Sequence, residues 1–182
     1  MYGCIDFYKA AKAAGIKPIM GCEVYVAPKS RFDREAGSQE DRYYHLVLLA
    51  ENNVGYANLM KIVSKGFVEG FYYKPRVDLE LLEKYHQGLI ALSACLAGEV
   101  PRYLVRGMYQ EAKEAALRYQ QIFGEGNYFL ELQDHGIPEQ QTVNQQLMRL
   151  HQETGIELTA TNDVHYTYAQ DATAHDILLC IQ

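Results

Sequence analysis

The sequence alternates between strand-like and helix-like segments along its length, and this alternation constrains the fold more than any other feature. Five short apolar segments are predicted as strands, over residues 18–26, 43–50, 88–94, 127–133 and 156–161. Helical patterns occupy most of the remainder, over residues 5–14, 54–66, 78–86, 107–123, 138–153 and 169–181. Nearly continuous apolar strands that alternate with helices are typical of a parallel sheet covered by helices. We therefore predict an α/β fold, either a doubly wound sheet or a barrel.

Two segments lie outside this alternation. Residues 27–42 are polar and form the clearest predicted loop, whereas residues 67–77 are aromatic and irregular. The first helix begins almost at Met1, with no N-cap residue and no strand before it. Because a complete α/β domain usually opens with a strand, we expect the natural domain to begin upstream of Met1.

Length, charge and cysteine content narrow the class of protein. The chain has 182 residues, the length of about one domain. Its formal net charge of −6 does not favour wrapping of duplex DNA, because phosphate contacts need clustered cations. No run of about 18 apolar residues indicates a membrane span, and the N-terminus lacks a signal-peptide pattern. The four cysteines form no C-x-x-C pair, so we expect reduced thiols in a cytoplasmic protein.

Each predicted strand supplies a side chain that can bind a metal. The set is Glu23, His45, Cys95, His135, Asp163 and His165. Four of the five strands place the donor at their carboxyl end, where parallel α/β sheets bind ligands; His45 lies early in its strand and is the exception. Imidazole, carboxylate and thiolate together suit Zn²⁺, Mn²⁺ or Fe rather than Ca²⁺ or Mg²⁺ alone. So many donors indicate two or three adjacent ions, which can clamp a phosphoryl group and supply a hydroxide.

Each of these residues taken alone also has an ordinary explanation. A lone His45 is more often a hydrogen-bonded core residue, Cys95 a small core residue, and Glu23 a surface charge. The argument for a metal site therefore rests on the whole set. An alternative enzyme would use Cys95 as a nucleophile with His165 and Asp163, but this arrangement leaves the other three donors unexplained.

Other candidates are weaker. Lys74 and Arg76 could bind a phosphate, and the neighbouring aromatic residues, Phe71, Tyr72 and Tyr73, could stack on bases. A packed aromatic loop with solvated charges explains the same residues equally well. The remaining histidines lie in helical patterns and are predicted to be ordinary surface or packing residues: His86, His151 and His175.

Six segments carry a family resemblance in addition to these patterns. They are MYGCIDFYKAAKAAGIKPIMGCEVYVA, HLVLLAEN, GFYYKPRVD, LIALSACLAGEV, LQDHGIPEQ and TNDVHY, in this order. Together they resemble the PHP (polymerase and histidinol phosphatase) domain of the bacterial DNA polymerase III alpha subunit, over nearly the whole chain. The resemblance implies a distorted seven-stranded (β/α)7 barrel, with residues 1–182 as a single PHP domain fragment that ends before the polymerase palm.

The resemblance also implies a function for the six donors. They match the family's ligands to a cluster of two or three Zn²⁺ or Mn²⁺ ions, associated with 3′–5′ exonuclease proofreading, with Asp163 and His165 in catalytic roles. It implies a parent DNA-directed DNA polymerase that acts on primer-template DNA with a sliding clamp, a clamp loader and a proofreading subunit. Two alternatives stay open: a scaffold that stabilises the polymerase and docks the proofreading subunit, and a metal-dependent phosphatase of the histidinol-phosphatase type.

The sequence departs from the family pattern at its start. The family's first strand–helix–strand unit, which carries four further ligands, should lie upstream of Met1. We therefore expect an incomplete barrel, with fewer ions or none and little or no nuclease activity in these 182 residues. We also expect the strand at 18–26 to be an exposed or borrowed edge, through which the fragment can oligomerise.

Overall fold

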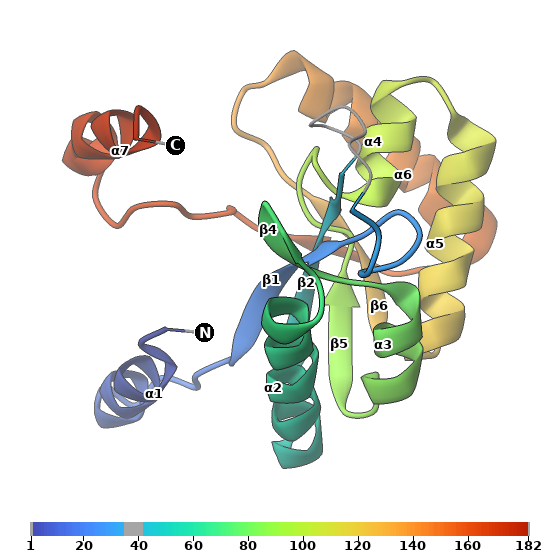
Figure 1. Ribbon diagram of the computed structural model, residues 1–182. Coiled ribbons are helices and arrows are strands. Elements are labelled where there is room, and N and C mark those ends of the chain that lie inside the picture. The colour runs from blue at the N-terminus through green and yellow to red at the C-terminus, as the bar shows by residue number, and fades with distance from the viewer. Residues whose placement is uncertain (1, 35–41, 182) are drawn as a thin grey trace.

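The computed structural model describes residues 2–34 and 42–181, and a seven-stranded sheet forms its centre (Figure 1). The strands are β1 (Gly21–Val26), β2 (Tyr44–Ala50), β3 (Phe71–Tyr72), β4 (Lys74–Val77), β5 (Leu89–Leu92), β6 (Tyr128–Leu132) and β7 (Leu158–Ala160). The α-helices are α1 (Cys4–Ala13), α2 (Asn53–Val68), α3 (Leu79–Tyr85), α4 (Glu99–Val105), α5 (Tyr109–Phe123), α6 (Pro138–Thr154) and α7 (Ala172–Leu179). A short 3-10 helix, Ala169–Asp171, precedes α7. The predicted α/β class is confirmed.

The strands run in the order β3-β4-β1-β2-β5-β6-β7, and their directions are mixed. The pairs β1–β4, β5–β6 and β6–β7 are parallel, but β2 is antiparallel to both β1 and β5. The expectation of a parallel sheet is therefore wrong at β2. The described residues that link β1 to β2 include no crossover helix, and a parallel pair needs such a crossover.

The five predicted strands and six predicted helices are present, with boundaries shifted by a few residues. The segment predicted as irregular, 67–77, instead contains the end of α2 and the small β3–β4 hairpin. Sequence patterns do not mark this hairpin, because β3 has only two residues and Pro75 is unfavourable inside a strand. Only the last two residues of β1, Tyr25 and Val26, pair with β4.

Local capping explains where several helices begin and end. The Asn52 side chain accepts a hydrogen bond from the Gly55 amide at 3.0 Å and caps α2. Asp78 caps α3 in the same way, accepting from the Leu81 amide at 3.2 Å. Pro138 is the first residue of α6, and Gly155 ends that helix with a φ of 74°.

The core lies between the sheet and helices α2 to α6. Helix α2 packs on β1, β2, β4 and β5, while α4, α5 and α6 pack on one another beside β5 and β6 (Figure 1). The most enclosed side chains of the core are aliphatic or aromatic and come from both strands and helices: Leu46, Leu48, Leu59, Ile62, Leu130, Leu147, Leu150, Tyr119 and Tyr128. Burial of this apolar surface is the main force that holds the sheet and helices together.

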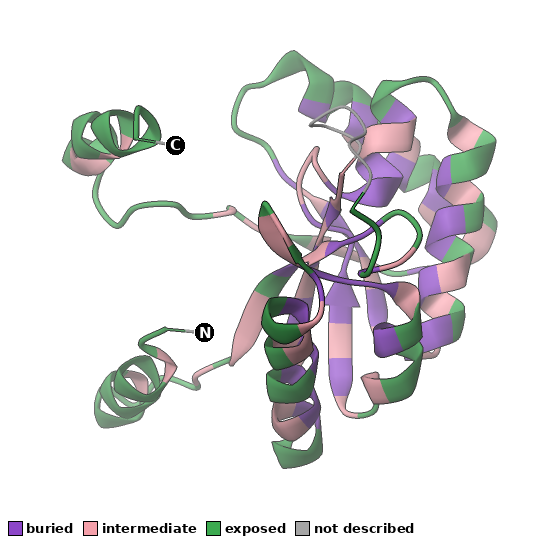
Figure 2. Ribbon diagram, viewed as in Figure 1, coloured by how far each residue is buried: buried purple, intermediate pink, exposed green. Residues whose placement is uncertain are grey.

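The two terminal helices differ from the rest. Neither α1 nor α7 contains a buried residue, and Figure 2 shows both projecting from the sheet on the same side. Their exposed residues include large apolar side chains such as Phe7 in α1 and Ile177 in α7. Within the described ranges, no helix has the length and apolar character needed to cross a membrane.

The predicted free edge at 18–26 is only partly correct. Strand β1 lies inside the sheet, and its carboxyl end is covered by β4. In the described residues, the part of β1 from Gly21 to Val24 pairs with β2 alone. This part of β1 therefore has one edge without a partner strand in the described residues, as the predicted oligomer through this strand requires. The carboxyl end of β1 has no such edge.

Candidate metal centre

Three of the six predicted donors meet in one cluster. Glu23 of β1, His45 of β2 and Cys95 after β5 each present one donor atom, and these atoms all lie within 4.8 Å of one another. Nδ1 of His45 is 3.2 Å from Oε1 of Glu23 and 3.6 Å from Sγ of Cys95. The side chains of His45 and Glu23 retain 22% and 36% of their exposure, so a small ion can reach the cluster from solvent.

The reversed direction of β2 explains the position of His45. His45 is the second residue of β2 and lies opposite Tyr25, near the end of β1. Because β2 is antiparallel to its neighbours, its beginning lies at the same edge of the sheet as the ends of β1 and β5. The early placement of His45 in its strand is thus what brings it to the other donors.

The loop after β5 is fixed against β2, which places Cys95 beside His45. The His45 amide donates a hydrogen bond to the Ala97 carbonyl at 3.0 Å, and His45 forms a β-bridge with Gly98. A Cβ atom at Gly98 would lie 2.1 Å from the Ser93 carbonyl oxygen, so the tight turn requires glycine. Ala94, one residue before Cys95, adopts a φ of 64°.

The hydrogen bonds of this cluster shift the pKa values of His45 and Glu23. Burial alone would lower the pKa of His45, but its hydrogen bonds with Cys95 and Glu23 outweigh burial and raise that pKa to about 9. The hydrogen bond from His45 lowers the pKa of the Glu23 carboxyl, and the charges of His45 and His165 lower it further. The cluster is therefore an ion pair at neutral pH, and a bound cation would take the place of the imidazole proton.

The other three predicted donors lie together in an adjoining cavity. His135, Asp163 and His165 line a cavity of about 720 Å³, and Cys95 lines it too. Cys95 thus joins the cluster to the cavity. His135 follows β6, and the other two follow β7. His135 and His165 are exposed, whereas Asp163 is half-buried and has an unusual φ of 43°.

Hydrogen bonds to main-chain carbonyls and to the Gln140 side chain hold two of the cavity histidines, His135 and His165. Nε2 of His135 donates to the Asn162 carbonyl at 2.7 Å, while the Gln140 amide donates to its Nδ1 at 2.9 Å. Nδ1 of His165 donates to the carbonyl of Asp163 at 2.7 Å. Each of these nitrogens must give up its present partner before it can bind a cation.

One histidine of the cavity was not predicted as a site residue. His175 was expected to be an ordinary helix residue, yet it lines the cavity, and its ring centre lies 5.7 Å from that of His165. It belongs to α7, and nothing in its local sequence distinguishes it from a surface histidine. The other two helical histidines, His86 and His151, bond to nearby carbonyls, as expected of packing residues.

The donor set fits a divalent transition metal. An imidazole, a carboxylate and a thiolate are ligands that Zn²⁺ accepts, and Mn²⁺ accepts the nitrogen and oxygen donors. A three-residue group leaves coordination positions for water or substrate, as catalytic zinc sites do. The geometry therefore allows a metal at the cluster and leaves its identity to experiment.

Comparison with known proteins identifies the family. The family described as "PHP domain" matches residues 1–135. The chain belongs to the PHP domain family. It is similar to the DNA polymerase III subunit alpha of Treponema pallidum, with 53% identity over 181 residues. Identity is 48% over 181 residues with that subunit of Borreliella burgdorferi, and 44% over 187 residues with that of Aquifex aeolicus. Each alignment covers 100% of this chain and 16% of the relative, so the chain spans about a sixth of their length.

The remaining predictions for this PHP chain concern nucleic-acid contacts. Arg76 is buried, and its guanidinium donates to the carbonyls of Gly70 and Arg31, at 3.3 Å and 3.2 Å, and of Asp33. The phosphate contact at Arg76 stays a prediction, and the structure disfavours it, because Nε and Nη2 already donate to main-chain oxygens. Lys74 is half-buried beside the Tyr25 ring and remains a candidate.

The alternative thiol-enzyme arrangement is not formed in this PHP chain. Cys95 contacts His45 rather than His165, and His165 bonds to the main-chain carbonyl of Asp163 rather than to its carboxylate. A nucleophile needs its base within hydrogen-bond reach and the base oriented by a third group. The six donors are better described as one cluster and an adjoining cavity.

Proposed function

We propose that this chain is the PHP part of a DNA polymerase III alpha subunit and that its strand-end donors hold divalent metal for 3′–5′ phosphodiester hydrolysis. The observation that carries the proposal is the convergence of donors from β1, β2 and β5 within 4.8 Å, next to a cavity that also carries donors. Such a set suits Zn²⁺ or Mn²⁺. The parent subunit would supply polymerase activity, since the relatives bear that name.

The residues divide into two roles in this proposal. Glu23, His45 and Cys95 bind the first ion, because their donor atoms already converge. Asp163, His165 and His135 line the cavity and hold a second ion or the scissile phosphate there. Adjacent divalent ions, when bound, polarise a phosphodiester and increase the acidity of the attacking water.

The cavity suits the end of a nucleic acid strand better than a duplex. Its lining is rich in imidazole and amide groups, which can donate hydrogen bonds to phosphate oxygens. The chain is acidic overall, with a net charge of −6, so long phosphate tracts would need cations from elsewhere in the subunit. We propose primer-template DNA as the substrate and the clamp, clamp loader and proofreading subunit as partners of the cytoplasmic parent protein.

The test is a nuclease assay on the alpha subunit that contains this chain. Single-stranded DNA with a 5′ label is incubated with the subunit and Mn²⁺ or Zn²⁺. We expect shortening from the 3′ end that stops with chelator. The variants Asp163→Asn and His165→Gln should each reduce cleavage by roughly 100-fold or more, the range for groups that transfer protons or position reactants.

Asp6→Asn serves as the matched control, because Asp6 is exposed on α1. Undiminished cleavage by both site variants would contradict the proposal, as would cleavage that chelator does not affect. Turnover of phosphomonoesters instead of DNA would favour a phosphatase of the histidinol-phosphatase type.

A scaffold role is the second candidate, and the terminal helices favour it. Helices α1 and α7 expose apolar side chains and bury none, which is typical of surfaces that other protein segments cover. In that case the site variants would leave nuclease activity unchanged and instead reduce subunit stability or binding of the proofreading subunit.

A further inference from the structure

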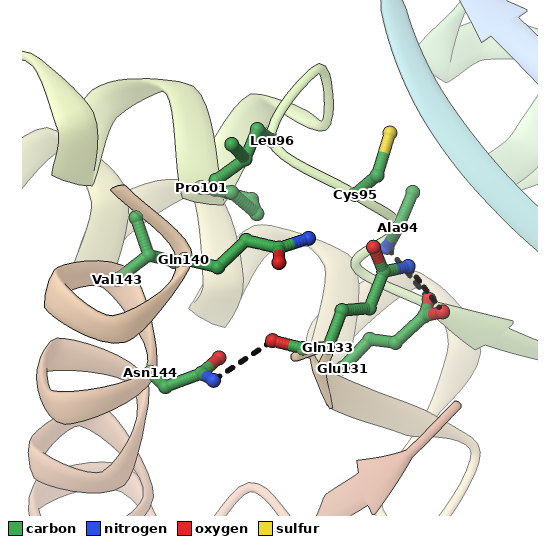
Figure 3. A pocket seen from close by; sticks show the side chains of 9 residues that line it. All are labelled: Ala94, Cys95, Leu96, Pro101, Glu131, Gln133, Gln140, Val143 and Asn144. Carbon is green, nitrogen blue, oxygen red and sulfur yellow. Dashed lines mark hydrogen bonds between the residues drawn. The ribbon is translucent and has the colours of Figure 1, made fainter. Parts of the chain in front are cut away.

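A buried carboxylate contacts the turn that carries Cys95, one of the donors of the candidate metal centre. Glu131 is the fourth residue of β6 and is only 5% exposed. Figure 3 shows it beneath Ala94 and Cys95, beside Gln133. An ionised carboxylate in such a position is costly unless hydrogen bonds satisfy its oxygens. Its partners therefore show what it stabilises.

Three neutral donors satisfy this carboxylate, and they come from three neighbouring strands or strand ends. Oε2 of Glu131 accepts from the Ala94 amide at 3.0 Å. Oε1 accepts from the side-chain amide of Gln133 at 3.0 Å and from the Thr161 hydroxyl. The main-chain amide of Glu131 also donates to the Ser93 hydroxyl at 2.8 Å. The segments that follow β5, β6 and β7 thus all form hydrogen bonds with the Glu131 side chain.

Each of these partners lies just before a donor of the proposed metal site. Ala94 immediately precedes Cys95. Gln133 lies two residues before His135, and Thr161 lies two residues before Asp163. A shift of Glu131 would therefore be transmitted over one or two residues to three separate donors.

The backbone conformation of Ala94 explains why a carboxylate at position 131 matters. Ala94 has a φ of 64°, a conformation that costs energy for a residue with a Cβ atom. Its amide points at Glu131, so the carboxylate stabilises the strained turn that carries Cys95. A glutamine at this position has the same shape, but it replaces one acceptor oxygen with an NH₂ group that faces a donor.

The geometry points to Glu131 as a positioning residue that sets the mutual placement of Cys95, His135 and Asp163 for metal binding. This inference rests on the proposed function. Glu131 does not lie within the Glu23–His45–Cys95 group, and it acts through hydrogen bonds to the segments that carry the donors. Residues that orient metal ligands in this way typically affect metal affinity by about 10- to 100-fold.

The experiment compares Glu131→Gln with the wild type in metal binding and in stability, both in the alpha subunit that contains this chain. Mn²⁺ affinity is measured by titration calorimetry, and Co²⁺ absorption reports whether the Cys95 thiolate joins the coordination. Glu157→Gln is the matched control, since Glu157 is exposed just before β7. We expect Glu131→Gln to weaken Mn²⁺ binding by about 10- to 100-fold and to reduce the thiolate-dependent Co²⁺ absorption. The control should change neither.

A second variant keeps the inference testable if Glu131→Gln does not fold. Thr161→Val removes one donor and preserves side-chain shape, so it should weaken Mn²⁺ binding by a few-fold, less than Glu131→Gln would. Unchanged Mn²⁺ affinity and Co²⁺ spectra in folded Glu131→Gln, or unchanged affinity in Thr161→Val, would overturn the inference and leave the proposed function standing. An alpha subunit that contains the wild-type chain and binds neither metal would overturn both.

Discussion

The two halves of the candidate site hold their donors in different ways. Glu23, His45 and Cys95 come from strands or from a turn bonded to a strand, and they contact one another. His135 and His165 come from loops after β6 and β7, are exposed, and bond to main-chain carbonyls. In the first half the donor atoms already lie within 4.8 Å of one another, whereas in the second half both ring nitrogens of His135 bond to other residues. Donors fixed by sheet pairing should therefore contribute more to affinity than donors on loops.

The largest expected effect is the loss of a strand-held donor. His45→Ala should weaken Mn²⁺ or Zn²⁺ binding by more than about 100-fold, above the range for residues outside the coordination sphere. His135→Ala should cost less, about 10-fold, because a cation there must first displace the 2.7 Å hydrogen bond of Nε2 or the 2.9 Å hydrogen bond of Nδ1. Titration calorimetry measures both, with His86→Ala as the control. Equal losses of metal affinity in the two variants would show that strand-held and loop-held donors contribute equally to binding.

The next effect is a pH dependence that belongs to the strand-held half. The pKa of His45 is raised to about 9, so its ion pair stabilises the metal-free protein fully below pH 6.5. This contribution is lost as the pH rises through about 9. Denaturant unfolding of chelator-treated protein should show a decrease on the order of 1–3 kcal/mol between these pH values, since one pKa unit corresponds to about 1.4 kcal/mol.

The matched control for this pH dependence is His45→Gln, which cannot titrate in that range. Its free energy of unfolding should fall less than that of the wild type between pH 6.5 and 9. The lowered pKa of Glu23 does not contribute there, because that carboxyl stays ionised throughout. If the free energy of unfolding fell equally with pH in the wild type and the variant, the pH dependence would not belong to His45.

The smallest effect concerns the loop-held half. Gln140 is buried, and its side chain bonds to the amide of His135 at 2.8 Å and to Nδ1 of the same residue at 2.9 Å. Gln140→Leu should lower the free energy of unfolding by roughly 1–2 kcal/mol, because each hydrogen bond contributes about 1 kcal/mol. Urea denaturation measures this change, with exposed Gln141→Leu as the control. A loss no greater than that of the control would show that Gln140 does not hold the loop.

Sequence reasoning located the elements but not their directions. Strands such as 43–50 and caps such as Asn52 and Asp78 depend on local patterns of apolar residues and side-chain acceptors. The antiparallel course of β2 depends on how a long connection returns to the sheet, which no local pattern encodes. For that reason the sequence made His45 an exception, although the folded sheet makes it a central member of the cluster.

The residues around the donors were the least predictable. Arg76 looks like an exposed phosphate contact in sequence, but its guanidinium is enclosed by main-chain oxygens from two loops. His175 has no distinguishing pattern in the sequence, and it lines the cavity because the fold brings its ring beside those of His165 and Tyr166. Glu131 has the strand position of an ordinary residue, and its importance appears only through partners as far as 37 residues away in the chain.

The amino-acid sequence alone determined the α/β class, the succession of elements and the six chemical groups able to bind a metal, because these follow from residue type and local periodicity. Tertiary structure alone decided which three of those groups contact one another, that Arg76 is buried, and which carboxylate bonds to the ends of three strands. Distances between residues remote in sequence depend on strand order and direction, and these are set by the packing of the whole sheet rather than by any one segment.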